Sequence, residues 1–202
     1  MTMLAELRSM SPDRPLTLRE AYVIAERQAT RLLRLSGVTS GPVPDEVISG
    51  LPFMAVHVRK LPGSSGATHW VKPRWIVLLN AYEPTVRRRF SLAHEFKHIV
   101  DHPRRKYRAA PSRTEHLANE RLCDFFSACL LMPRGWVKRA FGSGIQDIVD
   151  LANLFDVSPQ AMHVRLVQLG LLDVAQRCSG IDNERSTFYL RSLPVSPLEL
   201  AA

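Results

Sequence analysis

Two histidines four residues apart, His94 and His98, stand with Glu95 between them in the pentapeptide His-Glu-Phe-Lys-His. On a helix this spacing puts both imidazoles on one face, about 6 Å apart along the axis, so both could bind one zinc ion. Glu95 would lie on the adjoining face, where a carboxylate can act as general base toward a water molecule. The pattern predicts metal-assisted hydrolysis, and the alternative is a histidine pair that binds no metal.

A catalytic zinc site needs a third protein ligand and an open position. The segment downstream offers Glu115, His116, Glu120 and Asp124. Glu120 and Asp124 are one helical turn apart, so Glu120 could complete the site while Asp124 accepts a hydrogen bond from the outer nitrogen of a ligand histidine. Carboxylates at this spacing also occur on solvated helix faces, so both interpretations stay open.

The remaining histidines do not extend the pair into a larger cluster. His102 lies eight residues beyond His94, about 12 Å along a helix, so one ion cannot bind all three. We expect His102 to interact with the dipole at the end of the helix. His57, His69 and His163 are scattered along the chain, and each is predicted to be a hydrogen-bonded or solvent-exposed histidine.

The first half of the chain reads as a helix followed by short strands. Apolar residues at three- and four-residue steps predict a helix over Leu18–Leu35, capped by Thr17 and ended by Gly37, after a loose lead-in over residues 1–16. Alternating residues predict a strand over Phe53–Leu61. Two more strands, His69–Val71 and Trp75–Asn80, are predicted to join it in a small antiparallel sheet.

The second half is predicted to be helical. The H-E-x-x-H sequence falls in a helix from Thr85 to Val100, ended by Pro103, which biases residue 102 away from helix. A basic loop over 103–113 precedes the remaining segments. These are predicted as helices over Thr114–Leu131, Pro133–Phe141, Ile145–Phe155 and, capped by Ser158, up to Leu169.

These elements predict an α+β fold, in which a small antiparallel sheet packs on a zincin-like helical core. The core is assigned to residues 17–142. A helix-turn-helix-like segment follows over 143–175, and a peripheral tail occupies 176–202.

Composition is that of an ordinary globular protein. The chain has 202 residues, 46% hydrophobic and 23% charged, which excludes a largely disordered or coiled-coil chain. No apolar run approaches the roughly 18 residues of a membrane span, and Glu6 and Arg8 interrupt any N-terminal signal core, so we expect a cytoplasmic protein. Three cysteines without C-x-x-C spacing, Cys123, Cys129 and Cys178, are predicted to be core residues.

The net charge of +8 is concentrated in two clusters, Arg87–Arg89 and Arg104–Arg113. Such clusters attract nucleic acid or an acidic partner, but they also occur as solvated basic faces. A DNA-binding module is therefore one alternative, because Leu151–Leu169 has the pattern of two short helices around a turn. Against it, the second of these helices carries only Arg165 as a cation.

Two segments carry a resemblance to a known family. Arg89–Ile99, followed by His102, resembles the R-F-[ST]-x-A-H-E-x-x-H signature of the ImmA/IrrE zinc metallopeptidases. Glu120–Ser127, followed by Leu-Leu-Met-Pro at 130–133, resembles the second signature of that family. Leu151–Leu171 is similar to its C-terminal helical segment, so the resemblance covers residues 45–172.

The resemblance implies a gluzincin-like site with one zinc ion bound by His94, His98 and Glu120. Asp124 stands where the family usually has asparagine, which keeps the hydrogen-bonding capacity and adds a charge. Cys123 and Ser127 stand where the family has alanines. The resemblance also implies a protein substrate, a helix-turn-helix repressor whose cleavage relieves repression in phage, mobile-element or stress-response circuits.

The substrate contacts are less defined. An extended substrate could add to an open edge at Trp75–Asn80, and Asn80 and Tyr82 are the candidate substrate-binding residues. Tyr82, His57 and Tyr107 are candidates for stabilising the oxyanion. The other alternative is a regulator of the toxin–antitoxin or immunity type that binds a partner without cutting it, although such a protein has no need of Glu95.

Overall fold

The computed structural model describes residues 2–107 and 112–172, and these residues form eight α-helices, one 3-10 helix and a three-stranded sheet. The α+β prediction is confirmed. The chain divides into two compact units, Met1–Pro133 and Arg134–Ala202. The predicted tail 176–202 lies outside the described residues, as does Cys178. The first unit contains α1 (Met3–Ser9), α2 (Leu18–Leu35), α3 (Glu46–Ser49), β1 (Met54–Arg59), β2 (Gly66–Val71), β3 (Arg74–Asn80), α4 (Thr85–Asp101), η1 (His102–Tyr107) and α5 (Arg113–Leu131).

Helix α2 has the predicted boundaries because both of its ends are set by local chemistry. Thr17 and Glu20 form a reciprocal capping box, in which each side chain accepts a hydrogen bond from the backbone N–H of the other residue. Gly37, just beyond the C-terminus, has a φ of +69°, which favours glycine. The buried face of α2 packs against α5, where the Tyr22 and Phe125 rings meet edge to face at 4.8 Å.

A short helix, α1, occupies part of the segment predicted to be a loose lead-in, so that prediction is wrong for residues 3–9. Thr2 caps the helix, and its two buried leucines, Leu4 and Leu7, are too few to produce a periodic signal. The Arg8 guanidinium donates hydrogen bonds to the carbonyl oxygens of Ile99 (2.7 Å) and Val100 (3.3 Å) in the last turn of α4. This cation therefore satisfies the negative end of α4.

The sheet is mixed, not antiparallel as predicted. Its strand order is β1-β3-β2, with β1 parallel and β2 antiparallel to β3. The connection between β1 and β2 is held across the end of β3 by Asn80, whose amide donates hydrogen bonds to the carbonyl oxygens of Leu61 and Ser64, both at 2.8 Å. Because this connection crosses the end of β3, β2 pairs on the far side of β3 and not with β1.

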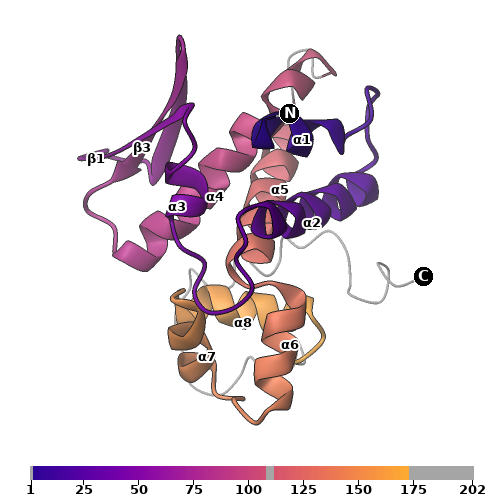
Figure 1. Ribbon diagram of the computed structural model, residues 1–202, viewed down its shortest axis with the longest axis vertical. Coiled ribbons are helices and arrows are strands. Elements are labelled where there is room, and N and C mark those ends of the chain that lie inside the picture. The colour runs from indigo at the N-terminus through magenta and orange to yellow at the C-terminus, as the bar shows by residue number, and fades with distance from the viewer. Residues whose placement is uncertain (1, 108–111, 173–202) are drawn as a thin grey trace. The chain divides into compact units, whose positions relative to one another are not determined.

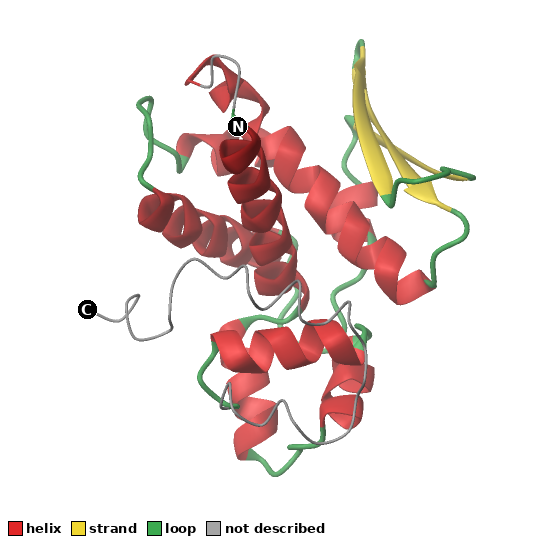
Figure 2. Ribbon diagram, turned by 180° about the vertical axis from the view of Figure 1, so that it is seen from behind, coloured by secondary structure: helices red, strands yellow, loops and turns green. Residues whose placement is uncertain are grey.

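Strand β3 is therefore central, and the edges of the sheet are β1 and β2, so the expectation of an open edge at β3 is wrong. The residues of β3 that alternate toward α4 are Trp75, Val77 and Leu79, and all three are buried. Figure 1 shows α4 between the sheet on one side and α2 and α5 on the other. From behind, Figure 2 shows the other face of the sheet turned away from these helices.

The H-E-x-x-H sequence lies in α4, which follows Pro84 and continues into η1 through Pro103. His102 has helical angles (φ −51°, ψ −43°), so the expected bias away from helix does not hold. Its ring packs edge-on against Trp75 at 5.0 Å. Burial, together with the positive charges of Arg105 and Arg8, lowers the pKa of His102, so the cation at the end of α4 is Arg8 and not His102 as predicted.

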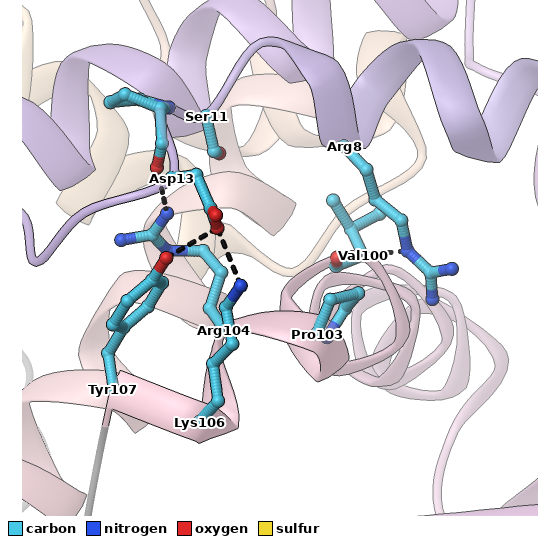
Figure 3. A pocket seen from close by; sticks show the side chains of 9 residues that line it. Arg8, Ser11, Asp13, Val100, Pro103, Arg104, Lys106 and Tyr107 are labelled. Carbon is cyan, nitrogen blue, oxygen red and sulfur yellow. Dashed lines mark hydrogen bonds and ion pairs between the residues drawn. The ribbon is translucent and has the colours of Figure 1, made fainter.

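The basic clusters are partly used within the first unit. Asp13 accepts hydrogen bonds from Lys106 (2.7 Å) and from the Tyr107 hydroxyl, while Arg104 donates to the carbonyl oxygen of Pro12 (2.8 Å). Figure 3 shows these side chains lining a small pocket between η1 and the loop after α1. The interactions tie η1 to the N-terminal segment.

The arginine cluster at the start of α4 is also engaged. Arg89 is buried and donates to the carboxylate of Asp45 (3.0 Å) and the carbonyl oxygen of Val43 (2.5 Å). Arg88 donates to the carbonyl oxygen of Glu83 (2.6 Å). These residues fix the loop before α3 and the start of α4, so part of the positive charge has a structural use.

The second unit contains α6 (Arg134–Gly142), α7 (Ile148–Phe155) and α8 (Pro159–Gln168), which confirms the three helices predicted there. Ser158 caps α8 by accepting a hydrogen bond from the N–H of Ala161 at 3.1 Å, with Pro159 at the first helical position. Helix α6 lies in this second unit.

Candidate active site

Three side chains from α4 and α5 converge where these helices pack against each other. The Nε2 atoms of His94 and His98 are 3.1 Å apart. The Glu120 carboxylate lies 3.2 Å from His94 Nε2 through Oε2 and 3.5 Å from His98 Nε2 through Oε1. The side chains of all three are partly exposed, at 16%, 21% and 35% respectively. Two imidazole nitrogens and a carboxylate thus meet at a position that solvent reaches.

The outer nitrogens of both imidazoles face α5. His94 Nδ1 lies 2.8 Å from Asp124 Oδ1, and His98 Nδ1 lies 3.6 Å from Cys123 Sγ. With its proton on Nδ1, each ring donates to its partner on α5 and leaves the lone pair of Nε2 directed toward Glu120. This is the arrangement by which outer partners orient metal-binding histidines.

Electrostatics at the cluster favour a bound cation. Burial alone would lower the pKa of His94, but the hydrogen bonds to Asp124 and Glu120 outweigh it and raise the pKa to about 9. Hydrogen bonds from His94 and His98 hold the pKa of Glu120 well below its usual range. The carboxylates that stabilise the protonated form of the His94 imidazole would equally attract a metal ion. Two imidazoles, one carboxylate and an open side fit the donor set of a catalytic zinc site.

Cys123 offers a different third ligand, because ligand atoms of His94, His98 and Cys123 lie within 4.8 Å of one another. However, the Cys123 side chain is fully buried, and burial raises the pKa of its thiol well above the usual value. A neutral thiol is a poor zinc ligand. Its sulfur also faces Nδ1 of His98, on the other side of the ring from Glu120. These observations favour Glu120 as the third ligand.

Glu95 of α4 lies against strand β2. Its carboxylate accepts a hydrogen bond from the Thr68 hydroxyl at 2.5 Å, and the residue is only 8% exposed. Gly66 makes room for it: a Cβ at that position would lie 3.1 Å from both Cγ and Oε1 of Glu95 and 3.2 Å from the carbonyl oxygen of Leu78. Sequence reasoning missed Gly66 and Thr68, because nothing in their spacing indicates that β2 lies beside α4.

The two predicted substrate-binding residues lie at the end of β3 (Asn80) and in the turn that follows it (Tyr82). The amide of Asn80 is 8% exposed and hydrogen-bonds the loop after β1, which gives it a structural role. Tyr82 is 67% exposed, with Lys60 Nζ 5.9 Å from its ring centroid, and its contact with substrate stays a prediction.

Other candidates from the sequence are engaged away from the cluster. Glu115 closes a capping box with Ser112 at the start of α5, about 7.5 Å along the helix from Glu120, and His116 beside it is exposed. The Tyr107 hydroxyl, a candidate for the oxyanion, donates to Asp13.

Comparison with known proteins agrees with this arrangement. Residues 50–167, more than half of the chain, match the family model described as the IrrE N-terminal-like domain, Peptidase_M78. The chain belongs to this peptidase family. The matched residues include α4, α5 and the whole sheet, and the resemblance to the ImmA/IrrE family is confirmed.

A solved structure of a Mycobacterium tuberculosis transcriptional regulator has a similar fold, with a TM-score of 0.55 and 19% sequence identity. The match covers 82% of this chain and 52% of the regulator, so the chain spans about half the length of that protein. At this identity the similarity shows the fold alone. No curated protein matches the chain. Among the described residues, no helix is long and apolar enough to cross a membrane.

Proposed function

We propose that this chain is a zinc-dependent endopeptidase whose metal ion is bound by His94, His98 and Glu120. The observation that carries the proposal is that the Nε2 atoms of His94 and His98 and the Glu120 carboxylate lie within 3.5 Å of one another. The Nδ1 atom of each histidine contacts a side chain of α5 instead. When bound, zinc polarises the scissile carbonyl and allows water to act as a nucleophile near neutral pH.

Glu95 is proposed as the general base. Its carboxylate takes a proton from the attacking water, and the same proton passes to the amine nitrogen as the C–N bond breaks. Because Thr68 donates to Oε2, Oε1 is the oxygen left to accept this proton. The contacts with Thr68 and Gly66 keep the carboxylate in one position, which supports a role that depends on exact placement relative to substrate.

The substrate backbone is proposed to pair with β2. An extended peptide adds to an open strand edge, and β2 is the edge strand that carries the Glu95 contact. This replaces β3, which is central. The geometry supports β2 over β1 because β2 and β3 are the strands that pack closely on α4.

The proposed substrate is a helix-turn-helix transcriptional repressor, cut to relieve repression. Membership of the peptidase family and the similar fold of a transcriptional regulator support this proposal. Its direct test is to incubate the zinc-loaded protein with candidate helix-turn-helix repressors and to follow cleavage by mass spectrometry.

The test of the chemistry compares metal content and cleavage in three proteins. We expect about one zinc per wild-type chain, marked loss of zinc in Glu120→Ala, and full zinc in Glu95→Gln. Cleavage should fall by about 10²–10⁴-fold in Glu95→Gln, because only the proton transfer is removed. A wild-type protein that takes up no zinc from a metal-containing buffer would contradict the proposal.

The same variant separates cutting from binding. If Glu95→Gln relieved repression as well as wild type does, the chain would act as a partner-binding regulator of the toxin–antitoxin or immunity type. The DNA-binding alternative has less support, because Arg165, the cation of α8, is 1% exposed and its guanidinium donates to Gln168. Salt-dependent binding of the wild-type protein to random duplex DNA would favour that alternative.

A further inference from the structure

Trp70 is an exposed aromatic residue on the edge strand that holds Glu95. Its residue surface is 52% exposed, which is unusual for so large an apolar side chain. Side chains alternate along a strand, so Trp70 lies on the same face of β2 as Thr68, about 7 Å farther along. Because Thr68 contacts Glu95, this face is the one turned toward α4 and the reaction centre.

The ring of Trp70 packs against a neighbouring aromatic ring of the sheet. Trp70 pairs with Trp75 of β3, and their ring centroids are 5.1 Å apart with an interplanar angle of 55°. Trp75 is buried and in turn contacts His102 at the end of α4, at 5.0 Å. One side of the Trp70 ring is therefore fixed by packing and the remainder faces solvent, which makes it a rigid apolar surface.

The direction of β2 relates this surface to the scissile bond. Gly66 and Thr68 lie against Glu95, whereas Trp70 lies toward His102, so β2 follows α4 in the direction of its C-terminus. In a peptide paired with the edge of β2, every second side chain would likewise point to the same face of the sheet. If one of its side chains faces the Glu95 end of the strand, the side chain two residues away lies beside Trp70.

We propose that Trp70 forms an apolar subsite that selects substrates with a large aliphatic or aromatic residue, two positions from the residue next to Glu95. This inference rests on the proposed peptidase function. It adds a substrate class, an extended segment with a large apolar side chain near the cut.

The experiment measures cleavage preference on a synthetic peptide library in which every position samples apolar, polar and charged residues. The zinc-loaded wild type is compared with Trp70→Thr, which keeps a strand-forming residue, and with Trp70→Phe, which keeps an aromatic ring. Val71→Ala is the matched control, because Val71 is exposed (58%) on the same strand but points to the opposite face. Products that also form with Glu95→Gln are subtracted.

We expect large apolar residues to be preferred over alanine about tenfold at one position on one side of the cut, the lower end of what an apolar pocket achieves. Trp70→Thr should reduce this preference to below about twofold, while Trp70→Phe and Val71→Ala retain most of it. Zinc content should match wild type in all three variants, and each should unfold cooperatively, with Trp70→Thr less stable only by the loss of its contact with Trp75, which shows that the change is one of specificity.

The outcomes separate this inference from the proposed function. Cleavage that depends on Glu95 but has no apolar preference, or keeps it in Trp70→Thr, would overturn the subsite and leave the peptidase intact. The absence of any cleavage that depends on Glu95 would overturn the peptidase proposal, and the subsite with it.

Discussion

Substitution of Gly66 by alanine is expected to separate catalysis from stability. The new Cβ would lie 3.1 Å from Cγ and Oε1 of Glu95 and 3.2 Å from the carbonyl oxygen of Leu78. Since the Leu78 oxygen belongs to the backbone of the central strand, the Glu95 side chain is the neighbour that must move, by a few tenths of an ångström.

The magnitude follows from this shift. A misplacement of about 1 Å in a catalytic group costs about 10²-fold in rate, so a shift of roughly half that size corresponds to about tenfold in kcat. Stability should change little, because Gly66 has a backbone conformation open to any residue, and alanine reduces the entropy of the unfolded chain by about 0.4–1 kcal/mol. This gain offsets the tight contact, so the free energy of unfolding should stay within about 1 kcal/mol of wild type.

The assay determines kcat and KM on a peptide that the wild type cleaves, together with zinc content and unfolding in urea. Gly135→Ala is the matched control, since a Cβ there meets nothing within 4 Å. It should leave kcat unchanged and stabilise α6 by about 0.5–1 kcal/mol. Wild-type kcat in Gly66→Ala would refute the idea that close contact with β2 positions Glu95. Loss of zinc in that variant would show that the metal ligands had moved instead.

Three further outcomes are expected. Asp124→Ala should weaken zinc binding about 10–100-fold by removing the acceptor of a ligand histidine, whereas Asp124→Asn keeps an acceptor and most of the affinity. Competition with a chromogenic chelator measures the zinc affinity of both variants, and an equal loss of affinity in the two would contradict the reasoning. Lys97→Met should destabilise the protein by about 3–5 kcal/mol in urea, because buried Asp101 and buried Gln28 lose the ammonium that donates to them at 2.8 Å and 2.7 Å. The double variant Lys97→Met/Asp101→Leu should recover part of this loss, since Gln28 still lacks its donor; no recovery would mean that the Lys97–Asp101 pair itself stabilises the fold. The hydrogen bond from Arg14, then those from Thr17, lower the pKa of Glu20 to about 2, so the contribution of Glu20 to stability is complete above the unfolded pKa of about 4.3 and disappears as the pH falls toward 2. Glu20→Gln should therefore flatten the pH dependence of the free energy of unfolding in urea over this window, and an unchanged slope would exclude Glu20 as its source.

Local signals predicted the helices well because a helix is stabilised by residues three and four apart. Thr17 and Ser158 mark helix starts through their own side-chain caps, and the four-residue spacing of His94 and His98 already places both imidazoles on one face. Helix α1 was not predicted, because seven residues with two buried leucines show no clear helical periodicity of apolar residues.

The sheet was predicted less completely, since strand positions are visible in a sequence and strand pairing is not. All three strands of the structure overlap predicted ones, although β2 begins at Gly66, three residues before the predicted start at His69. The parallel pairing of β1 with β3 depends on Asn80, which bonds a loop 16 and 19 residues earlier in the chain. Neighbouring strands more often pair with each other, so the usual expectation was an antiparallel arrangement.

The amino-acid sequence alone indicated the chemistry proposed for this protein: the residue types and helical spacing of a candidate metal-binding pair with its adjacent carboxylate, and the signatures of a peptidase family. Tertiary structure decided which residues complete and position that chemistry. Glu120 reaches His94 across 26 residues, and Thr68 reaches Glu95 across 27. Helix periodicity relates residues within about one turn, whereas contacts at these separations depend on how α5 and β2 pack on α4.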